Sequence, residues 1–300
     1  MSGFASQQLS RLRRLAFLLG NQPQYVLGRF PAVRDAYSTL NAFKDAIRGP
    51  VPLKIGDLHD EPSTMVKVVT SGHLQPTAPT ERQAEEMKMQ SYSLGPHLSV
   101  KAVAELREAA ACMPLKASGI ASTTYDAMAL SRELREKVAI ATVQNSSTIP
   151  VIRALAGDPL LYEVARRFLG YQPKRVSSWF FWSLVNTLSD DQRRARSQTI
   201  DFHYDVNGFN FVYANFYLFD TSYQNGAHVL IEGTGRRKRL RDLIGTSRLS
   251  NSDALKLYGP ERERVMEGPA GFGFVEDASC YHKALPPTHS DRLMLQLRYQ

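Results

Sequence analysis

His203, Asp205 and His282 are the residues of this 300-residue chain whose types and spacing best suit metal-dependent chemistry. Residues i and i+2 of an extended strand point to the same side, so the imidazole of His203 and the carboxylate of Asp205 can bind one ion. His282, at the end of the segment 277–282, can supply a second imidazole. Two imidazoles and one carboxylate leave coordination positions open on Fe(II), as in non-haem iron oxygenases. The sequence therefore predicts an iron site.

The surroundings of each His-x-Asp triplet separate this site from a second one. Residues 199–202 and the aromatic run 209–213 flank His203 and predict a strand, a turn and a strand. The second triplet, His289-Ser290-Asp291, follows Pro286-Pro287 in a predicted turn, and few residues remain after it to provide a third ligand. We therefore expect no metal at the second triplet.

Arg292 opens the last predicted strand, residues 292–299, ten residues after His282. The segment 285–291 can reverse the chain, so we expect an antiparallel partner strand to bring Arg292 back beside His282. A guanidinium there could hold a dicarboxylate through two parallel hydrogen bonds, which lysine could not reproduce. Arg298 would face the same side, but it lies two residues from the chain end, further from the iron, and ranks second.

Three sequence blocks, in order and at characteristic spacing, point to a known family. They are Gln198–Asp205, then Phe216–Asp220 followed by Asn225–His228, and finally Gly273–His282 closing with Asp291–Leu293. From about Ser197 to Tyr299, roughly the last third, the chain resembles the phytanoyl-CoA dioxygenase family of Fe(II)/2-oxoglutarate-dependent oxygenases.

The resemblance implies a ligand set and a pair of cosubstrates. His203, Asp205 and His282 correspond to the iron ligands, and Arg292 to the residue that binds the distal carboxylate of 2-oxoglutarate. Asn215 and Gln198 match positions that often touch this cosubstrate. The implied reaction consumes 2-oxoglutarate and O2 and releases succinate and carbon dioxide, most simply while hydroxylating an unactivated carbon.

Two features bear on the reaction and the substrate. A carboxylate at position 205 favours hydroxylation, because halogenases of this type lack it. The Pro-Gly-Ser-His stretch common in the family is replaced by Glu232–Gly235, near the usual substrate position, so the resemblance does not define the substrate. Desaturation or cyclisation of a natural-product intermediate at the same iron centre remains an alternative. A non-catalytic basic jelly-roll binding protein is another, and no specific nucleic-acid motif is present.

The positive charge of the chain, +8 in total, is concentrated in two places. Residues 1–50 hold seven basic and two acidic side chains, and residues 236–241 hold five basic ones. These runs are either solvated helix faces or surfaces for an anionic partner. We expect an anionic small-molecule or lipid-linked substrate, for example a lipid, an acidic sugar of a cell-envelope glycolipid or a biosynthetic intermediate.

The N-terminal stretch 9–19 places Leu9, Leu12, Ala16 and Leu19 on one helical face. Such a helix could lie on a membrane surface or dock on the core of this protein. Its apolar run is too short to span a bilayer. Two cysteines give no disulfide framework, and a reducing compartment fits Fe(II) chemistry. The expected location is cytoplasmic, at the inner face of a membrane if the N-terminal helix binds one.

The expected fold is of the α+β class, with a double-stranded β-helix (jelly-roll, cupin-like) core and flanking N-terminal helices. Residues 1–300 form one catalytic domain, mainly helix and loop over 1–170 and jelly roll over 171–300. Three helices are predicted, at Val100–Met113, Leu130–Val143 and, with Asp158 as cap and Gly170 as stop, over 158–170. A long loop is expected over residues 70–97 and a buried strand over Val176–Val185.

Overall fold

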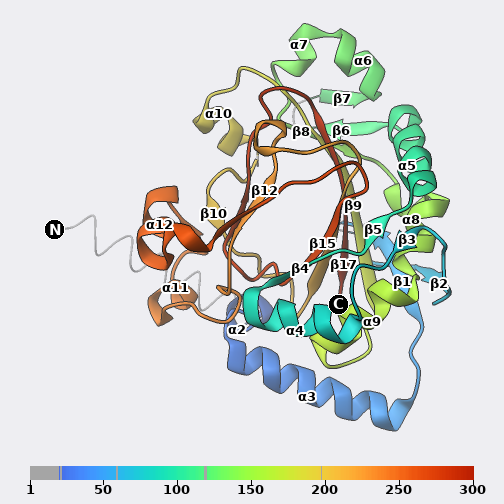
Figure 1. Cartoon of the computed structure of the whole chain (residues 1–300), viewed down its shortest axis with the longest axis vertical. Helices are drawn as coiled ribbons and strands as arrows, with labels where there is room; N and C mark the ends of the chain where they lie inside the picture. The colour runs from blue at the N-terminus through green and yellow to red at the C-terminus, as the bar shows by residue number, and fades with distance from the viewer. Residues whose placement is uncertain (1–19, 21, 59, 118–119, 197) are drawn as a thin grey trace.

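The computed structural model describes residues 20, 22–58, 60–117, 120–196 and 198–300. Two β-sheets face each other in the centre, with helices on the outside of both (Figure 1). The N-terminal stretch 9–19 lies outside the described residues, so its expected helix stays a prediction. Within the described part of the chain, none of the helices combines the length and apolar character that a membrane crossing needs.

The larger sheet contains ten strands in the order β4-β15-β11-β17-β9-β8-β6-β7, with β1 also beside β9 and β2 beside β1. Its pairs are antiparallel except for β1 with β9. Its strands are β1 (Leu53–Asp57), β2 (Thr64–Val66), β4 (Tyr92–Leu94), β6 (Leu115–Ala117), β7 (Ile120–Thr123), β8 (Ile140–Val143), β9 (Arg175–Ser183), β11 (Val212–Tyr217), β15 (Gly273–Glu276) and β17 (Arg292–Tyr299).

The smaller sheet has five antiparallel strands in the order β13-β10-β16-β12-β14. These strands are β10 (Phe202–His203), β12 (His228–Ile231), β13 (Arg248–Leu249), β14 (Glu263–Met266) and β16 (His282–Ala284). From β9 onward the chain alternates between the sheets except at β12, β13 and β14, which follow one another in the smaller sheet; β9, β11, β15 and β17 belong to the larger one and β10 and β16 to the smaller one. A separate hairpin pairs β3 (Leu74–Gln75) with β5 (His97–Leu98).

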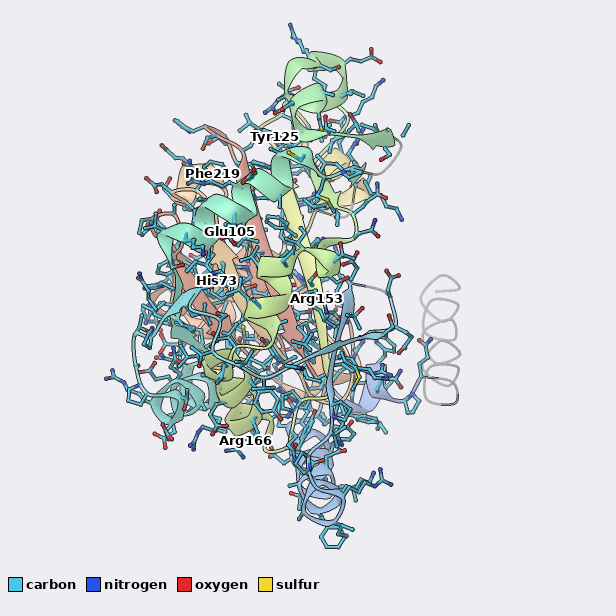
Figure 2. All side chains as sticks on the ribbon, turned by 90° about the vertical axis from the view of Figure 1, so that its right-hand side faces the viewer. His73, Glu105, Tyr125, Arg153, Arg166 and Phe219 are labelled. Atoms are coloured by element: carbon cyan, nitrogen blue, oxygen red, sulfur yellow. The ribbon has the colours of Figure 1, made fainter. Side chains whose placement is uncertain are left out.

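Alternate side chains give the larger sheet an apolar outer face and an inner face that carries both polar and apolar side chains. Phe180, Val275 and Leu295 lie on the outer face, in the main hydrophobic core. The helices α5 (Val100–Cys112), α8 (Pro150–Ala156) and α9 (Pro159–Leu169) contribute to the same core. Figure 2 looks onto these helices, with Glu105, Arg153 and Arg166 labelled on them. The helices cover the outer face, so side chains of the inner face are the ones that can form a functional site.

The other helices lie at the ends of the sheets and over the outer side of the smaller one (Figure 1). They are α2 (Gln24–Leu27), α3 (Pro31–Arg48), α4 (Thr80–Gln90), α6 (Tyr125–Leu130), α7 (Arg132–Arg135), α10 (Asp190–Ala195), α11 (Leu240–Ile244) and α12 (Asn251–Tyr258). Ala254 of α12 packs with Phe202 and Val229 on that outer side. Both sheets thus have one covered face and one face turned toward the other sheet.

Two predicted helices and the buried strand are confirmed. Helix α5 matches the prediction for Val100–Met113, and β9 matches that for Val176–Val185. In α9 the Asp158 side chain accepts a hydrogen bond from the backbone N–H of Leu160, and Gly170 ends the helix in the left-handed conformation. The capping rules therefore hold here.

Two predictions for the N-terminal half are wrong in part. Among the described residues before 171, the short strands β1 to β8 also accompany the helices, and six of these strands extend the larger sheet. Residues 130–143 form the short helix α7 and then β8, because the β-branched end of this segment pairs with β9. Residues 70–97 contain α4, which buries Gln83, Ala84 and Met87 at helical spacing.

Candidate metal and cosubstrate site

His203, Asp205 and His282 converge between the two sheets. His203 on β10 and His282 on β16 lie directly opposite each other in an antiparallel pair, so both rings project to the same side. Each of the three residues offers a ligand atom, and these atoms lie within 4.8 Å of one another. Nε2 of His203 is 3.6 Å from Oδ1 of Asp205. This spacing suits one ion held by two imidazoles and a carboxylate.

Backbone carbonyls orient both imidazole rings. Nδ1 of His203 lies 3.1 Å from the carbonyl oxygen of Asp201, and Nδ1 of His282 lies 3.0 Å from that of Cys280. A proton on each Nδ1 donates to the carbonyl and leaves Nε2 with a free lone pair. Burial, reinforced by the nearby His282, lowers the pKa of His203 to about 4, so its ring is neutral near pH 7. Neutral imidazole is the form that binds a metal.

Asp205 is held by contacts that leave one oxygen free. The Tyr213 hydroxyl donates to Oδ2 over 2.7 Å, and the backbone N–H of Asp205 donates to the carbonyl of Ala278 over 2.9 Å. Burial raises the pKa of Asp205, but His282, His203 and the Tyr213 hydrogen bond outweigh this effect and hold it below its ordinary 3.8. The carboxylate is thus ionised, with Oδ1 turned toward the histidines.

Arg292 lies in the opposite sheet from His282, which corrects the expectation that their strands would pair. Strand β17 pairs with β9 and β11, whereas β16 pairs with β10 and β12. The chain crosses from one sheet to the other over residues 285–291 and does not form a hairpin. Arg292 shares the inner face of the larger sheet with Met294 and Gln296.

The guanidinium of Arg292 is buried without a counter-ion among the described residues. Nη2 donates to Oγ of Ser183 over 2.9 Å, and Nη1 donates to the carbonyl of Gly226. Nε has no hydrogen-bond partner in the described part of the chain. Burial lowers the pKa of Arg292, yet a guanidinium stays charged in a protein. A buried and uncompensated charge is costly, so this position calls for an anionic ligand.

Gly226 makes the turn that brings this carbonyl to Arg292. Its φ is +83°, a conformation that favours glycine, and an added Cβ would lie 2.8 Å from the carbonyl oxygen of Leu285. This turn therefore requires a glycine after Asn225. It positions an acceptor for Arg292 and starts β12 with His228 turned inward.

Asn215 and Gln198 both carry buried amide groups with unused donors. Asn215 is on the inner face of β11, and its Oδ1 accepts a 2.9 Å hydrogen bond from Gln296. Oε1 of Gln198 accepts a 3.0 Å hydrogen bond from Arg193. The Nδ2 of Asn215 and the Nε2 of Gln198 find no partner among the described residues. Their role in binding the cosubstrate stays a prediction, to which these free donors are suited.

His228 and Glu276 form a buried contact that the sequence did not predict. Nε2 of His228 is 2.8 Å from Oε2 of Glu276, and the His228 ring stacks on His282 with 5.2 Å between ring centroids. Neither residue was among the predicted site residues. The available signal was an acidic residue ending the apolar strand 273–276, where an unpaired charge would be expensive.

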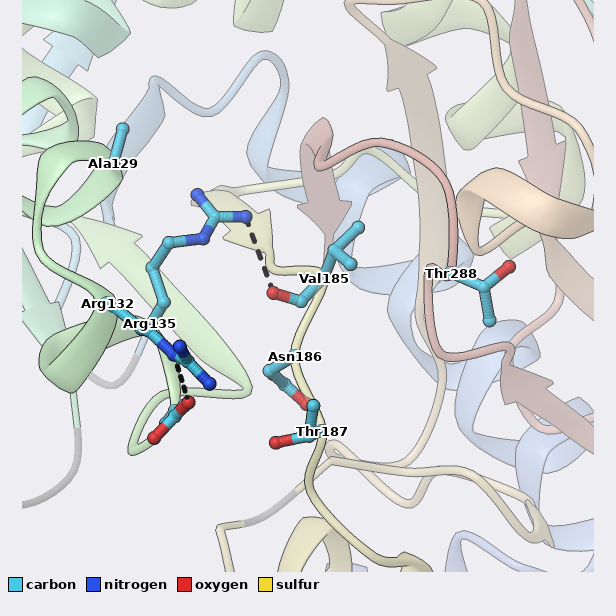
Figure 3. Close-up of a pocket in the computed structure, with 8 residues that line it drawn as sticks. Ala129, Arg132, Arg135, Val185, Asn186, Thr187 and Thr288 are labelled. Carbon is cyan, nitrogen blue, oxygen red and sulfur yellow. Dashed lines mark hydrogen bonds and ion pairs between the residues drawn. The ribbon is translucent and has the colours of Figure 1, made fainter.

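Two cavities of about 540 and 510 Å³ open on the surface, and no residue of the candidate metal site lines either. The first lies between α7 and the segment 185–187, where Arg135 donates to the carbonyl of Val185 (Figure 3). The second lies where β1 and β8 meet the same side of β9, and it includes Trp179. Trp179 stacks on Phe181 at 3.9 Å, and the Phe181 ring lies 5.7 Å from the guanidinium carbon of Arg292. The second cavity thus borders the inner face.

Three of the five basic side chains in the run 236–241 pair with acidic residues of the protein, since Arg241 shares Asp242 with Arg239. Arg236 pairs with Asp35, and Arg239 pairs with Asp242 at 2.7 Å. The ammonium of Lys238 lies 4.7 Å from the centroid of the Tyr204 ring. The run belongs to the outer side of the smaller sheet, beside α11. The run is therefore turned away from the space between the sheets that holds the candidate ligands.

No protein-family model and no curated protein sequence matches the chain. It is similar to solved structures of the non-haem α-ketoglutarate-dependent epimerase SnoN and carbocyclase SnoK, both from nogalamycin biosynthesis. SnoN is 16% identical with a TM-score of 0.49, over 74% of this chain and 82% of SnoN. SnoK is 18% identical with a TM-score of 0.48, over 77% of this chain and 85% of SnoK.

A third similar structure is EvdO2 from Micromonospora carbonacea var. aurantiaca, solved with 2-oxoglutarate. It is 14% identical with a TM-score of 0.49, over 75% of this chain and 91% of EvdO2. At such identities these three structures define neither substrate nor reaction, so the functional conclusion rests on the side-chain geometry.

Proposed function

We propose that this chain is an Fe(II)/2-oxoglutarate-dependent oxygenase. The observation that carries the proposal is the pairing of two features between the sheets, the ligand set of His203, Asp205 and His282 and the buried, uncompensated Arg292. The alternation of β9 to β17 between the sheets supports the expected double-stranded β-helix core.

The residues present fit both implied groups. Two imidazoles and one carboxylate form the set that binds Fe(II) with positions left open. Arg292 offers a guanidinium to a distal carboxylate, and Nδ2 of Asn215 is a free donor on the same inner face. When bound, Fe(II) with 2-oxoglutarate and O2 supplies the oxidising power for attack on a C–H bond, with release of succinate and carbon dioxide.

The protein itself holds the metal and the cosubstrate, orients the metal ligands and excludes water from the site. His203 and His282 present Nε2, and Tyr213 fixes the orientation of Asp205. Arg292 sets the position of the cosubstrate. An apolar cluster between the sheets limits the access of water, and it consists of Phe181, Tyr217, Leu230, Met266, Phe274, Cys280 and Met294. Water exclusion strengthens each of these polar contacts.

We further propose hydroxylation of an unactivated carbon as the reaction, because a carboxylate occupies position 205. Desaturation or cyclisation of a natural-product intermediate would use the same residues and is the second candidate. The proposed substrate is an anionic small molecule or a lipid-linked molecule. A non-catalytic binding protein is disfavoured, because it would not need an intact ligand set beside a buried arginine.

The test is anaerobic binding of Fe(II) and 2-oxoglutarate, followed by the visible charge-transfer band of the chelate. The wild type should show the band, His203→Ala should abolish it, and Arg292→Gln should raise the 2-oxoglutarate concentration needed by about 10- to 100-fold, as expected for the loss of charged hydrogen bonds. His289→Ala and Arg237→Gln change exposed residues of the same types and should leave the band intact. A wild type that binds neither component would reject the function.

A further inference from the structure

Arg298 lies beside the metal-binding carboxylate and has no acidic partner. It is directly opposite Tyr213 on β11 and Ser177 on β9, so it faces the space between the sheets. Tyr213 is the residue whose hydroxyl donates to Asp205.

The contacts of Arg298 leave most of its hydrogen-bonding capacity unused. Nη2 donates to Oγ of Ser177 over 3.3 Å, and Nε has no partner among the described residues. No carboxylate of the described chain lies within ion-pair distance of this side chain. Arg298 is half-buried, so it remains reachable from solvent. It is therefore a charged donor directed toward the site without a structural partner.

Arg248 flanks the same ligand set from the smaller sheet. It is directly opposite His203 in the pair of β13 with β10, so the two side chains project to the same side. The neighbouring acid, Asp201, is already bound by Arg194 over 2.6 Å. Arg248 is exposed and forms no ion pair with any described residue.

The formal charges of the loaded site show what these two arginines lack. Fe(II) and Arg292 together would balance Asp205 and the two carboxylates of 2-oxoglutarate. Glu276 lies 2.8 Å from His228. Arg248 and Arg298 form no ion pair with a described residue, and each lies on a different sheet, opposite His203 and Tyr213 respectively. Positive charges that line one site favour an anionic ligand.

We propose that Arg248 and Arg298 bind an anionic group, a carboxylate or a phosphate, of the substrate to be oxidised. This inference rests on the proposed oxygenase function and gives the expected anionic substrate a pair of contact residues. It replaces the basic run 236–241 as the source of that specificity, because most of the run is paired within the protein. A guanidinium can hold either anion through two parallel hydrogen bonds.

The test uses probes that share a chain and differ in the head group. Hexyl phosphate, hexanoate and hexanol are titrated by anaerobic calorimetry into protein loaded with Fe(II) and 2-oxoglutarate. At least one anion should bind about tenfold more tightly than hexanol, and Arg248→Gln or Arg298→Gln should each weaken that anion by about tenfold. The probe whose affinity exceeds that of hexanol by the larger factor shows whether the site prefers a phosphate or a carboxylate. Arg298→Lys should recover part of the loss, because it restores the charge alone.

Arg237→Gln is the matched control, since it removes an exposed arginine away from the metal ligands. Equal or undetectable binding of the anions and hexanol to the wild type would overturn the proposal, as would anion binding that neither variant weakens. A loss of 2-oxoglutarate affinity in Arg298→Gln as large as that in Arg292→Gln would assign Arg298 to the cosubstrate instead. A missing chelate band in the wild type would reject the oxygenase function itself, while calorimetry on that protein would still decide whether an anion site exists.

Discussion

Nη2 of Arg34 lies 2.9 Å from Oδ1 of Asp277, and both side chains are almost completely buried. Arg34 also donates to Asn210 and Ser279, so helix α3 is fixed to the loop between β15 and β16. The carbonyl of Ala278 in this loop accepts the backbone N–H of Asp205. The contact between Arg34 and Asp277, which are 243 positions apart, therefore helps to position the loop that contacts Asp205 and leads to His282.

We expect Arg34→Met to destabilise the protein strongly. The substitution leaves Asp277 buried without its cation, and removing one partner of a buried pair costs about 3–5 kcal/mol. Urea denaturation measures this loss in the free energy of unfolding. Arg166→Met, which breaks the partly exposed pair with Glu163, is the control and should cost about 1 kcal/mol or less. An equal decrease in the free energy of unfolding for the two variants would show that burial does not determine how much the Arg34–Asp277 pair stabilises the protein.

The same pair predicts a pH dependence of stability. Burial raises the pKa of Asp277, but Arg34 and the Ser279 hydrogen bond outweigh this effect and hold it below its ordinary 3.8. The unfolded chain therefore takes up this proton first as the pH falls. The stabilisation is complete above about pH 4 and is lost as the pH falls through the lower folded-state pKa. Asp277→Asn should flatten the fall in the urea midpoint between about pH 5 and pH 2. An unchanged slope would contradict the assignment.

Local sequence rules predicted those features of the structure that depend on residues close together in the chain. Asp158 and Gly170 define α9 through capping, and the spacing of His203 and Asp205 brings both side chains to one ligand set. The position of Arg292 was not deducible in the same way. Alternation indicates the face on which a strand residue lies, but it does not indicate which strand pairs with it. The partner of β17 is β9, more than 100 residues earlier in the chain.

The same limit explains why Arg34 and Glu276 were not identified. Each is ionic, and each is buried because a partner from a distant segment compensates its charge. From the sequence alone, Arg34 is a charged residue of a helix and Glu276 a charged residue at the end of a strand. Such residues are ordinarily expected to be exposed to solvent. Only the tertiary pairing distinguishes these residues from the exposed charges around them.

Tyr213→Phe should weaken metal binding without removing a ligand. The substitution deletes the hydroxyl that donates to Oδ2 of Asp205, and loss of such a supporting hydrogen bond lowers metal affinity by about 10- to 100-fold. Burial raises the pKa of Tyr213 well above 10, so the hydroxyl is a donor at neutral pH. Competition with a chromogenic chelator measures Fe(II) affinity. Tyr223→Phe, at an exposed tyrosine, should match the wild type.

Asp291→Asn should impair cosubstrate binding more than metal binding. The Asp291 carboxylate accepts hydrogen bonds from Arg135 and Tyr125 and from the backbone N–H of Val185, immediately before Arg292 begins β17. Loss of this anchor should raise the dissociation constant of 2-oxoglutarate by about tenfold, since small displacements of a positioning residue are costly. Titration of the chelate band measures it. Glu136→Gln disrupts the exposed pair with Arg132 and is the control. A matched loss of Fe(II) affinity would argue for a general structural effect.

The His228 and Glu276 pair should show energetic coupling that a double-mutant cycle can measure. Burial raises the pKa of Glu276, but the charge and hydrogen bonding of His228 outweigh this effect and hold it below its ordinary 4.5. Glu276→Gln alone removes the partner of a buried imidazole, and His228→Phe alone leaves a buried carboxylate without a cation. The double variant leaves neither charge unpaired, so it should be more stable than the sum of the single losses predicts, by about 0.5–3 kcal/mol. Urea denaturation of the wild type and the three variants gives this coupling. Additive losses would mean that the two side chains act independently, despite the 2.8 Å between them.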